Sequence, residues 1–254
     1  MAPNMWVIGP IVWIGLAVLI GLTIAFITAS RRAKRTGDPS PLVGVTLSVS
    51  ALWAAVCAIA ATIVVLTTLM QDDIRITVPV QEFWPQLPEG TVVEGPTATR
   101  VGGGFVTAEI LATGLSTAVR VCWAIGQGLG ILMPGVIAAL LAIASFQLIA
   151  GRTFAPVVSR MAWVTAAVVA AGGIASQVMN DVAGTMAATE LLASGAGHYV
   201  EVAGIEDVFA AWLPRPGLEI TFPFWPLAAG LAFAALAIIL RHGSRLQRDT
   251  DGLV

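Results

Sequence analysis

Three polar side chains share one helical face within an otherwise apolar stretch of the chain. Gln177, Asn180 and Asp181 stand at positions i, i+3 and i+4, the spacing that brings side chains together on a helix. Amides and a carboxylate in such a place can hydrogen-bond to a neighbouring helix or line a polar cavity. We expect hydrogen bonding between helices here, with a cavity as the alternative.

Two upstream residues are candidates for the same place. Arg120 and Asp181 are expected near the outer ends of neighbouring membrane spans, where an interfacial ion pair or two solvated ends are favoured over a substrate or ion site. Gln127 lies in the same span as Arg120. The predicted outer polar cluster therefore comprises Arg120, Gln127, Gln177, Asn180 and Asp181.

Other chemistry finds little support in the residue pattern. His198 and His242 are expected on opposite sides of the membrane, so they cannot share a metal ion. The spacing Gly126-x-Gly128-x-Gly130 does not follow a strand, so it does not predict a nucleotide site. We expect neither an enzyme nor a bound cofactor or metal.

The composition indicates which solvent surrounds the chain. Of its 254 residues, 57% are hydrophobic and only 11% are charged. Soluble domains carry roughly 25% charged residues, so an integral membrane protein is indicated, with the lipid bilayer as its partner. The net charge of −2 gives no reason to expect direct nucleic-acid binding.

Hydropathy predicts an all-α bundle of about five spans, because a spanning helix needs about 20 apolar residues. They are about Met5–Ile27, Pro41–Met70, Val121–Ala150, Ala162–Val182 and Phe222–Leu240. Residues 1–30 would form an N-terminal anchor, and residues 31–254 a four-span domain with outer loops at 71–120 and 183–221. The three glycines at 126, 128 and 130 and the small face Ala166–Ala175 predict that spans three and four pack closely.

Basic residues predict the orientation, because Lys and Arg near span ends stay on the cytoplasmic side. Five spans place nine of the 13 basic residues on one face, and the other four are Arg75, Arg100, Arg120 and Arg215. We expect a bacterial cytoplasmic membrane, the amino terminus outside and the carboxyl terminus in the cytoplasm. The inner-face residues are Arg31, Arg32, Lys34, Arg35, Arg152, Arg160, Arg241, Arg245 and Arg248.

The outer loops are expected to form a small cap containing short β-strands. Alternating Ile74, Ile76, Val78 and Val80 predict one strand, and Val92-Val93 and Val101–Val106 predict others. Helical spacing resumes from Thr107 to Arg120. The second outer loop predicts two short helices separated by a polar turn.

The carboxyl-terminal residues resemble a known family. Arg241-His242-Gly243, Arg245-Leu246 and the terminal Asp251-Gly252-Leu253-Val254, with the turn Gly151-Arg152-Thr153-Phe154, resemble the bacterial membrane family called domain of unknown function 2975. The resemblance covers about residues 45–254. It implies four spans, so the first helix would be an addition. It also implies a small cytoplasmic helix-turn-helix regulator as partner, and supplies no catalytic residues.

Two functions remain open. The favoured hypothesis is a non-enzymatic sensory or regulatory membrane protein with a folded outer cap and basic inner segments. The alternative is a small transporter or permease subunit with a polar site between spans three and four.

Overall fold

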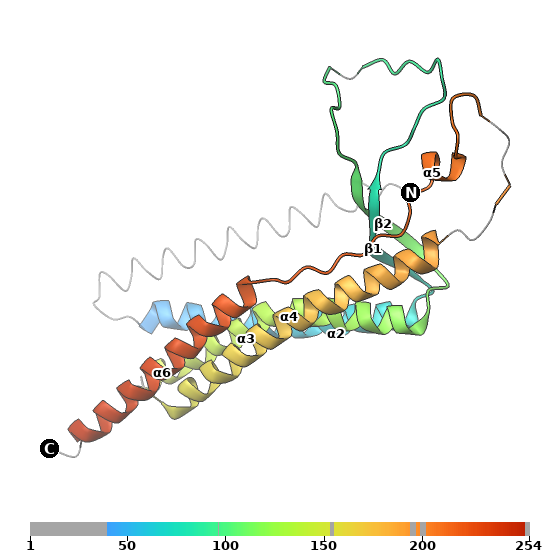
Figure 1. The fold of residues 1–254 in the computed structure, drawn as a ribbon. Coiled ribbons are helices and arrows are strands. Elements are labelled where there is room, and N and C mark those ends of the chain that lie inside the picture. Colours follow the sequence, from blue (N-terminus) through green and yellow to red (C-terminus); the bar gives the residue numbers. More distant parts are fainter. Residues whose placement is uncertain (1–39, 96, 153–154, 194–196, 199–201, 252–254) are drawn as a thin grey trace. The chain divides into compact units, whose positions relative to one another are not determined.

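The computed structural model describes residues 40–251, apart from 96, 153–154, 194–196 and 199–201 (Figure 1). The first predicted span and the basic cluster at 31–35 lie outside these residues, as do the side chains of 246–251, Arg248 included. The described elements, in order, are α2 (Ser40–Met70), β1 (Asp73–Phe83), β2 (Phe105–Thr113), α3 (Thr117–Ile149), α4 (Pro156–Leu192), α5 (Val208–Trp212) and α6 (Trp225–Asp251).

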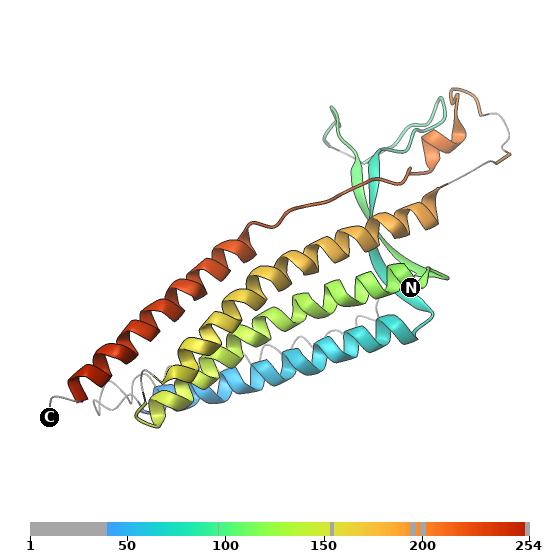
Figure 2. The same ribbon diagram turned by 60° about the horizontal axis from the view of Figure 1, so that its bottom comes forward.

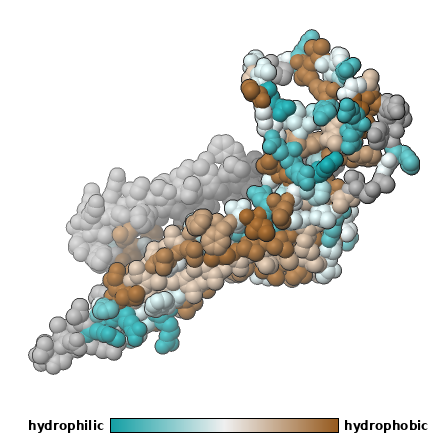
Figure 3. Space-filling model, viewed as in Figure 1, coloured by the Kyte–Doolittle hydropathy of each residue, from teal (hydrophilic) through white to brown (hydrophobic). Residues whose placement is uncertain are grey.

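Four described helices are long and apolar enough to cross a membrane: Pro41–Met70, Thr117–Ile149, Pro156–Leu192 and Trp225–Arg245. They overlap the second to fifth predicted spans. Large apolar side chains on them remain exposed, such as Leu52 at 61% and Leu231 at 72%, and brown surface covers much of the helices in Figure 3. Lipid is the solvent that such surface requires, so the chain is a multi-pass membrane protein.

The chain divides into two compact units. The sheet unit comprises Ala61–Gly130 and Gly172–Phe224. Of the described residues, the helical unit comprises 40–60, 131–171 and 225–251. Helices α2, α3 and α4 each contribute residues to both units.

The sheet unit contains two antiparallel strands, β1 and β2, with Ile76 opposite Ile110. The alternation predicted for Ile74, Ile76 and Val78 is confirmed, since all three are buried on one face. The helix predicted from Thr107 to Arg120 is wrong over its first half, because Thr107–Thr113 pairs with β1 and α3 begins only at Thr117. Val92 and Val93, predicted as strand, are exposed and lie in no strand.

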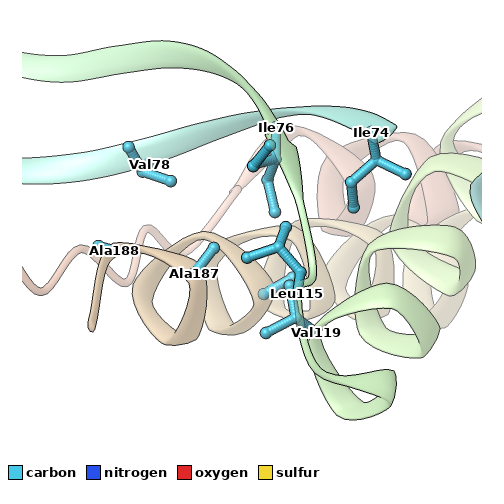
Figure 4. Close-up of a cluster of buried hydrophobic side chains, with 9 residues drawn as sticks. Ile74, Ile76, Val78, Leu115, Val119, Ala187 and Ala188 are labelled. Atoms are coloured by element: carbon cyan, nitrogen blue, oxygen red, sulfur yellow. The ribbon is translucent and has the colours of Figure 1, made fainter. Parts of the chain in front are cut away.

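A cluster of apolar side chains joins the sheet to the two helices beneath it (Figure 4). Ile76 of β1 lies over Leu115 and Val119, and Val78 lies on the side of Ala187 and Ala188 of α4. Ile74 and Ala183 belong to the same cluster. Because these alanines are fully buried, the carboxyl part of α4 buries an apolar face against the sheet.

This packing explains the length of α4. Its 37 residues span about 56 Å at 1.5 Å per residue, whereas the hydrocarbon core is about 30 Å thick. The predicted boundary at Val182 was that of the membrane span; the helix itself continues beside the sheet to Leu192. This stretch is the first of the two short helices predicted for the second loop, and α5 is the second.

Glycines set the helix packing within the sheet unit. A Cβ at Gly126 would collide with Asn180 of α4, and one at Gly130 would lie 3.2 Å from the Ser176 Oγ. A Cβ at Gly128 would lie 2.8 Å from Val65 Cγ2 of α2. The predicted close approach of α3 and α4 is confirmed here, with Gly128 facing α2 instead.

The helical unit packs along a second set of small residues. Leu140, Val158, Ala162 and Ala237 form a buried cluster from α3, α4 and α6. A Cβ at Gly230 of α6 would lie 2.7 Å from Ala170 Cβ and 3.0 Å from the Ala166 carbonyl oxygen. The small face predicted for span four therefore contacts α6 at these two alanines. The order α2, α3, α4, α6 is visible in Figure 2.

Candidate functional site

The sheet unit contains a polar cavity of about 290 Å³ where the sheet meets α3 and α4. Its lining residues come from β1, β2, α3, α4 and the segment before α6: Thr77, Pro79, Thr107, Trp123, Gln177, Asn180, Asp181, Gly184 and Glu219. The volume is near the lower end of small-ligand pockets, which run from about 300 Å³ upward. Hence a ligand of only a few heavy atoms fits it.

The predicted polar face of α4 forms part of this lining. Gln177 Nε2 donates to Asp181 Oδ1 over 2.8 Å, and the backbone N–H of Thr221 donates to Asp181 Oδ2 over 2.7 Å. Gln127 Nε2 of α3 donates to Asn180 Oδ1 over 3.4 Å. The structure thus brings together four of the five predicted residues. The Gln127–Asn180 and Thr221–Asp181 bonds join different elements, and Gln177, Asn180 and Asp181 line the cavity.

Arg120 does not join this group. Its guanidinium donates to the carbonyl oxygen of Gln71 over 2.6 Å and to that of Asp72. Both carbonyls follow the carboxyl end of α2, where backbone acceptors lack intrahelical partners and a cation is favoured by the helix dipole. Of the two expected arrangements, an ion pair or two solvated ends, the ion pair does not form: Arg120 caps α2, and Asp181 is bonded to Gln177 and Thr221.

The charge of the lining is one-sided. Asp181 and Glu219 supply two carboxylates, Trp123 supplies an aromatic face, and no lining residue is basic. Thr77 and Thr107 add hydroxyl groups from the two strands. Carboxylates together with an indole favour a cation, because both the ion charge and the ring quadrupole attract it.

Sequence patterns missed six of the nine lining residues, four of which have polar or aromatic side chains. Thr77 and Thr107 come to the same cavity only through strand pairing, in which Thr107 stands opposite Pro79 and Thr77 opposite Glu109. Trp123 and Glu219 reach the cavity from α3 and from an irregular segment. Trp123 stands one helical turn from Gln127, which is the one local signal that could have placed it.

Close backbone contacts hold the irregular segment between α5 and α6 against β1. Gly217 N donates to the Pro79 carbonyl oxygen over 3.0 Å, and a Cβ at Gly217 would lie 2.7 Å from the Val80 backbone carbon. Gly184 of α4 lies equally close to the sheet, since its Cβ would be 2.7 Å from the Thr77 carbonyl oxygen. Glycine at both positions lets the backbones approach and thereby sets the cavity wall.

Three of the predicted inner-face arginines come together in the helical unit. A cavity of about 490 Å³, here called the arginine cavity, is lined by Pro156, Ser159, Arg160, Trp163, Arg241, Ser244 and Arg245. Arg152 is exposed and is not among the lining residues.

Metal ligands are not grouped in the part of the chain that the structure describes. Over those residues, no three His, Cys, Asp or Glu side chains lie close enough to hold a metal ion. Cys57 is buried and Cys122 half-buried, both as free thiols.

Comparisons with protein-family models, with curated proteins and with solved structures gave no match.

Proposed function

We propose that this chain is a non-enzymatic sensory or regulatory membrane protein whose sheet unit binds a small organic cation, of the amine or quaternary ammonium class. The observation that carries the proposal is the cavity beside β1, β2, α3 and α4, with Asp181, Glu219 and Trp123 in its lining. It contains cation-attracting groups and no basic side chain of its own.

The proposal includes the kind of membrane and the orientation of the chain within it. Five spans in a bacterial cytoplasmic membrane, with the amino terminus outside, would place the sheet unit outside and Arg152, Arg160, Arg241 and Arg245 in the cytoplasm. The basic inner face then serves as the surface for a cytoplasmic partner, for which a small helix-turn-helix regulator is the candidate by family resemblance. The support is the asymmetric distribution of Lys and Arg.

Binding is tested by isothermal titration of the purified full-length protein with choline. Its uncharged isostere 3,3-dimethylbutanol serves as the ligand control. We expect choline to bind and the isostere to bind at least about tenfold more weakly, because the isostere keeps the shape and loses the charge. Equal binding of both compounds, or binding of neither, would contradict the proposal.

Two variants locate the ligand within the sheet unit. Glu219→Gln removes an exposed cavity carboxylate, and Trp123→Leu removes the indole. Each should weaken choline binding by about 3- to 30-fold, the range of a cation–π or short ion–ion contact. The matched controls Glu94→Gln and Trp53→Leu alter residues outside the lining and should leave the affinity unchanged.

A transporter remains the second candidate, because Gln177, Asn180 and Asp181 do line a cavity, as that hypothesis requires. The two functions are distinguished by the amount of labelled choline that proteoliposomes retain when they are preloaded with buffer and exposed to this compound. A sensor retains label in proportion to the protein present, and the amount saturates at one equivalent. Accumulation well beyond that amount, abolished by Glu219→Gln, would establish transport.

A further inference from the structure

Three arginine side chains, Arg160, Arg241 and Arg245, converge at the arginine cavity. On α4, Pro156, Ser159, Arg160 and Trp163 follow the spacing i, i+3, i+4, i+7 and so lie along one face. On α6, Arg241, Ser244 and Arg245 repeat the spacing i, i+3, i+4. Two helix faces therefore turn three guanidinium groups toward one cavity.

These helices contact each other directly at this level. Ser159 Oγ donates to the carbonyl oxygen of Ala237 over 3.2 Å, and Ala162 and Ala237 are fully buried in the same cluster. The cavity walls are therefore held together by packing. Arg160, Arg241 and Arg245 are exposed at the rim, and the two ion pairs of the described side chains, Arg75–Glu109 and Arg215–Asp207, involve none of them.

The start of α4 adds to the positive potential. This helix begins at Pro156, which itself lines the cavity. The first N–H groups of a helix carry a partial positive charge and favour anions, phosphates above all. The arginines and the helix start therefore attract the same kind of ligand.

The position along the helices indicates where that ligand comes from. The apolar span of α6 ends at Arg245, and that of α4 begins at Pro156, so the cavity lies at span ends, where headgroups are found. Trp163 is 47% exposed beside it, as is typical of indoles at a membrane interface. Teal surface gathers near this end of α6 in Figure 3.

We infer that the arginine cavity binds the phosphate headgroup of an anionic phospholipid. Arginine forks bind phosphate oxygens through two parallel hydrogen bonds, and three arginines line this cavity. A volume of about 490 Å³ accommodates a glycerophosphate headgroup while its acyl chains lie along the exposed apolar faces of the helices. Basic pockets between spans bind headgroups of this kind.

The test uses the full-length protein in detergent, titrated with phosphatidylglycerol or phosphatidylcholine and followed by native mass spectrometry. We expect saturable binding of phosphatidylglycerol and at least about tenfold weaker binding of phosphatidylcholine, whose headgroup carries a compensating cation. Binding should weaken as salt rises, because exposed charges are screened. Equal binding of the two lipids would overturn the inference.

A matched pair of variants distinguishes a built cavity from diffuse surface charge. Arg245→Gln and Arg152→Gln each remove one positive charge, but only Arg245 lines the cavity. Arg245→Gln should weaken phosphatidylglycerol binding about fivefold, the expected effect of one basic residue, and Arg152→Gln should leave it unchanged. If both variants weaken binding equally, diffuse surface charge binds the lipid and the inference of a built cavity is overturned. Arg160→Gln, on the other helix, should reproduce the effect of Arg245→Gln.

A final arm separates lipid from free phosphate. Inorganic phosphate and glycerol 3-phosphate are added to the complex with phosphatidylglycerol at concentrations up to a thousandfold excess. Retention of the lipid supports a membrane-derived ligand, since the acyl chains add contacts that a free anion lacks. Full displacement at concentrations equal to that of the lipid would assign the cavity to a soluble phosphate compound and overturn the lipid proposal.

Discussion

The carboxylate of Asp181 accepts a hydrogen bond from the backbone N–H of Thr221, with 2.7 Å between nitrogen and Oδ2. The two residues belong to different elements of the sheet unit: Asp181 to α4, and Thr221 to the irregular segment that follows α5. The contact anchors that segment, which also carries Glu219 to the cavity. Asp181 thus shapes the candidate site as well as lining it.

Replacing Asp181 by Ala should release this segment. We expect faster hydrogen–deuterium exchange at Thr221 and a loss of about 1–2 kcal/mol in the free energy of unfolding, because a charged acceptor is lost for two donors. The measurement is exchange mass spectrometry combined with thermal denaturation in detergent. Glu94→Ala, an exposed acid in the β1–β2 connection, is the control. Unchanged exchange in the segment would show that the backbone contacts near Val80 suffice to hold it.

Gly126 should tolerate no side chain. Because its Cβ would collide with Asn180, we expect Gly126→Ala to cost about 1–3 kcal/mol through forced separation of α3 and α4. Gly44→Ala, also within a helix but with nothing within 4 Å of its Cβ, should be neutral or slightly stabilising. Thermal denaturation of both variants measures the difference. A Gly126→Ala variant as stable as Gly44→Ala would mean that the helices do not pack as described.

Arg120 should matter for stability and not for ligand binding. Arg120→Gln removes the guanidinium that caps the end of α2, and we expect a loss of about 1–2 kcal/mol. Arg75→Gln breaks an exposed ion pair with Glu109 and should cost less than about 1 kcal/mol. Choline titration of the folded Arg120→Gln protein should give the wild-type affinity. A loss of choline affinity would show that Arg120 contributes to the candidate site.

Cysteine labelling tests the proposed orientation. In a background with Cys57 and Cys122 replaced by Ala, we introduce Thr91→Cys in the β1–β2 connection and, separately, Ser40→Cys or Arg152→Cys. An impermeant maleimide applied to intact cells should label position 91 and leave positions 40 and 152 unlabelled until the cells are lysed. The reverse pattern would invert the topology.

The sequence determined the features that depend on local composition and periodicity. Apolar runs of span length predicted α2, α3 and α6. Because burying charge in lipid is costly, few charged residues interrupt a span, and each span is therefore visible as a continuous apolar run. The alternation of Ile74, Ile76 and Val78 predicted β1, since one face of a strand alternates with the other. The polar face at Gln177, Asn180 and Asp181 followed from helical spacing alone.

Only the tertiary structure decided which of these features meet. Thr107–Thr113 has helix-compatible spacing but forms β2, because strand pairing depends on the distant partner β1. Arg120 caps the end of α2 instead of meeting Asp181, and Gly128 faces α2 whereas Gly126 faces α4. Such contacts join residues far apart in sequence, and their geometry is set by packing between elements, which no local pattern encodes.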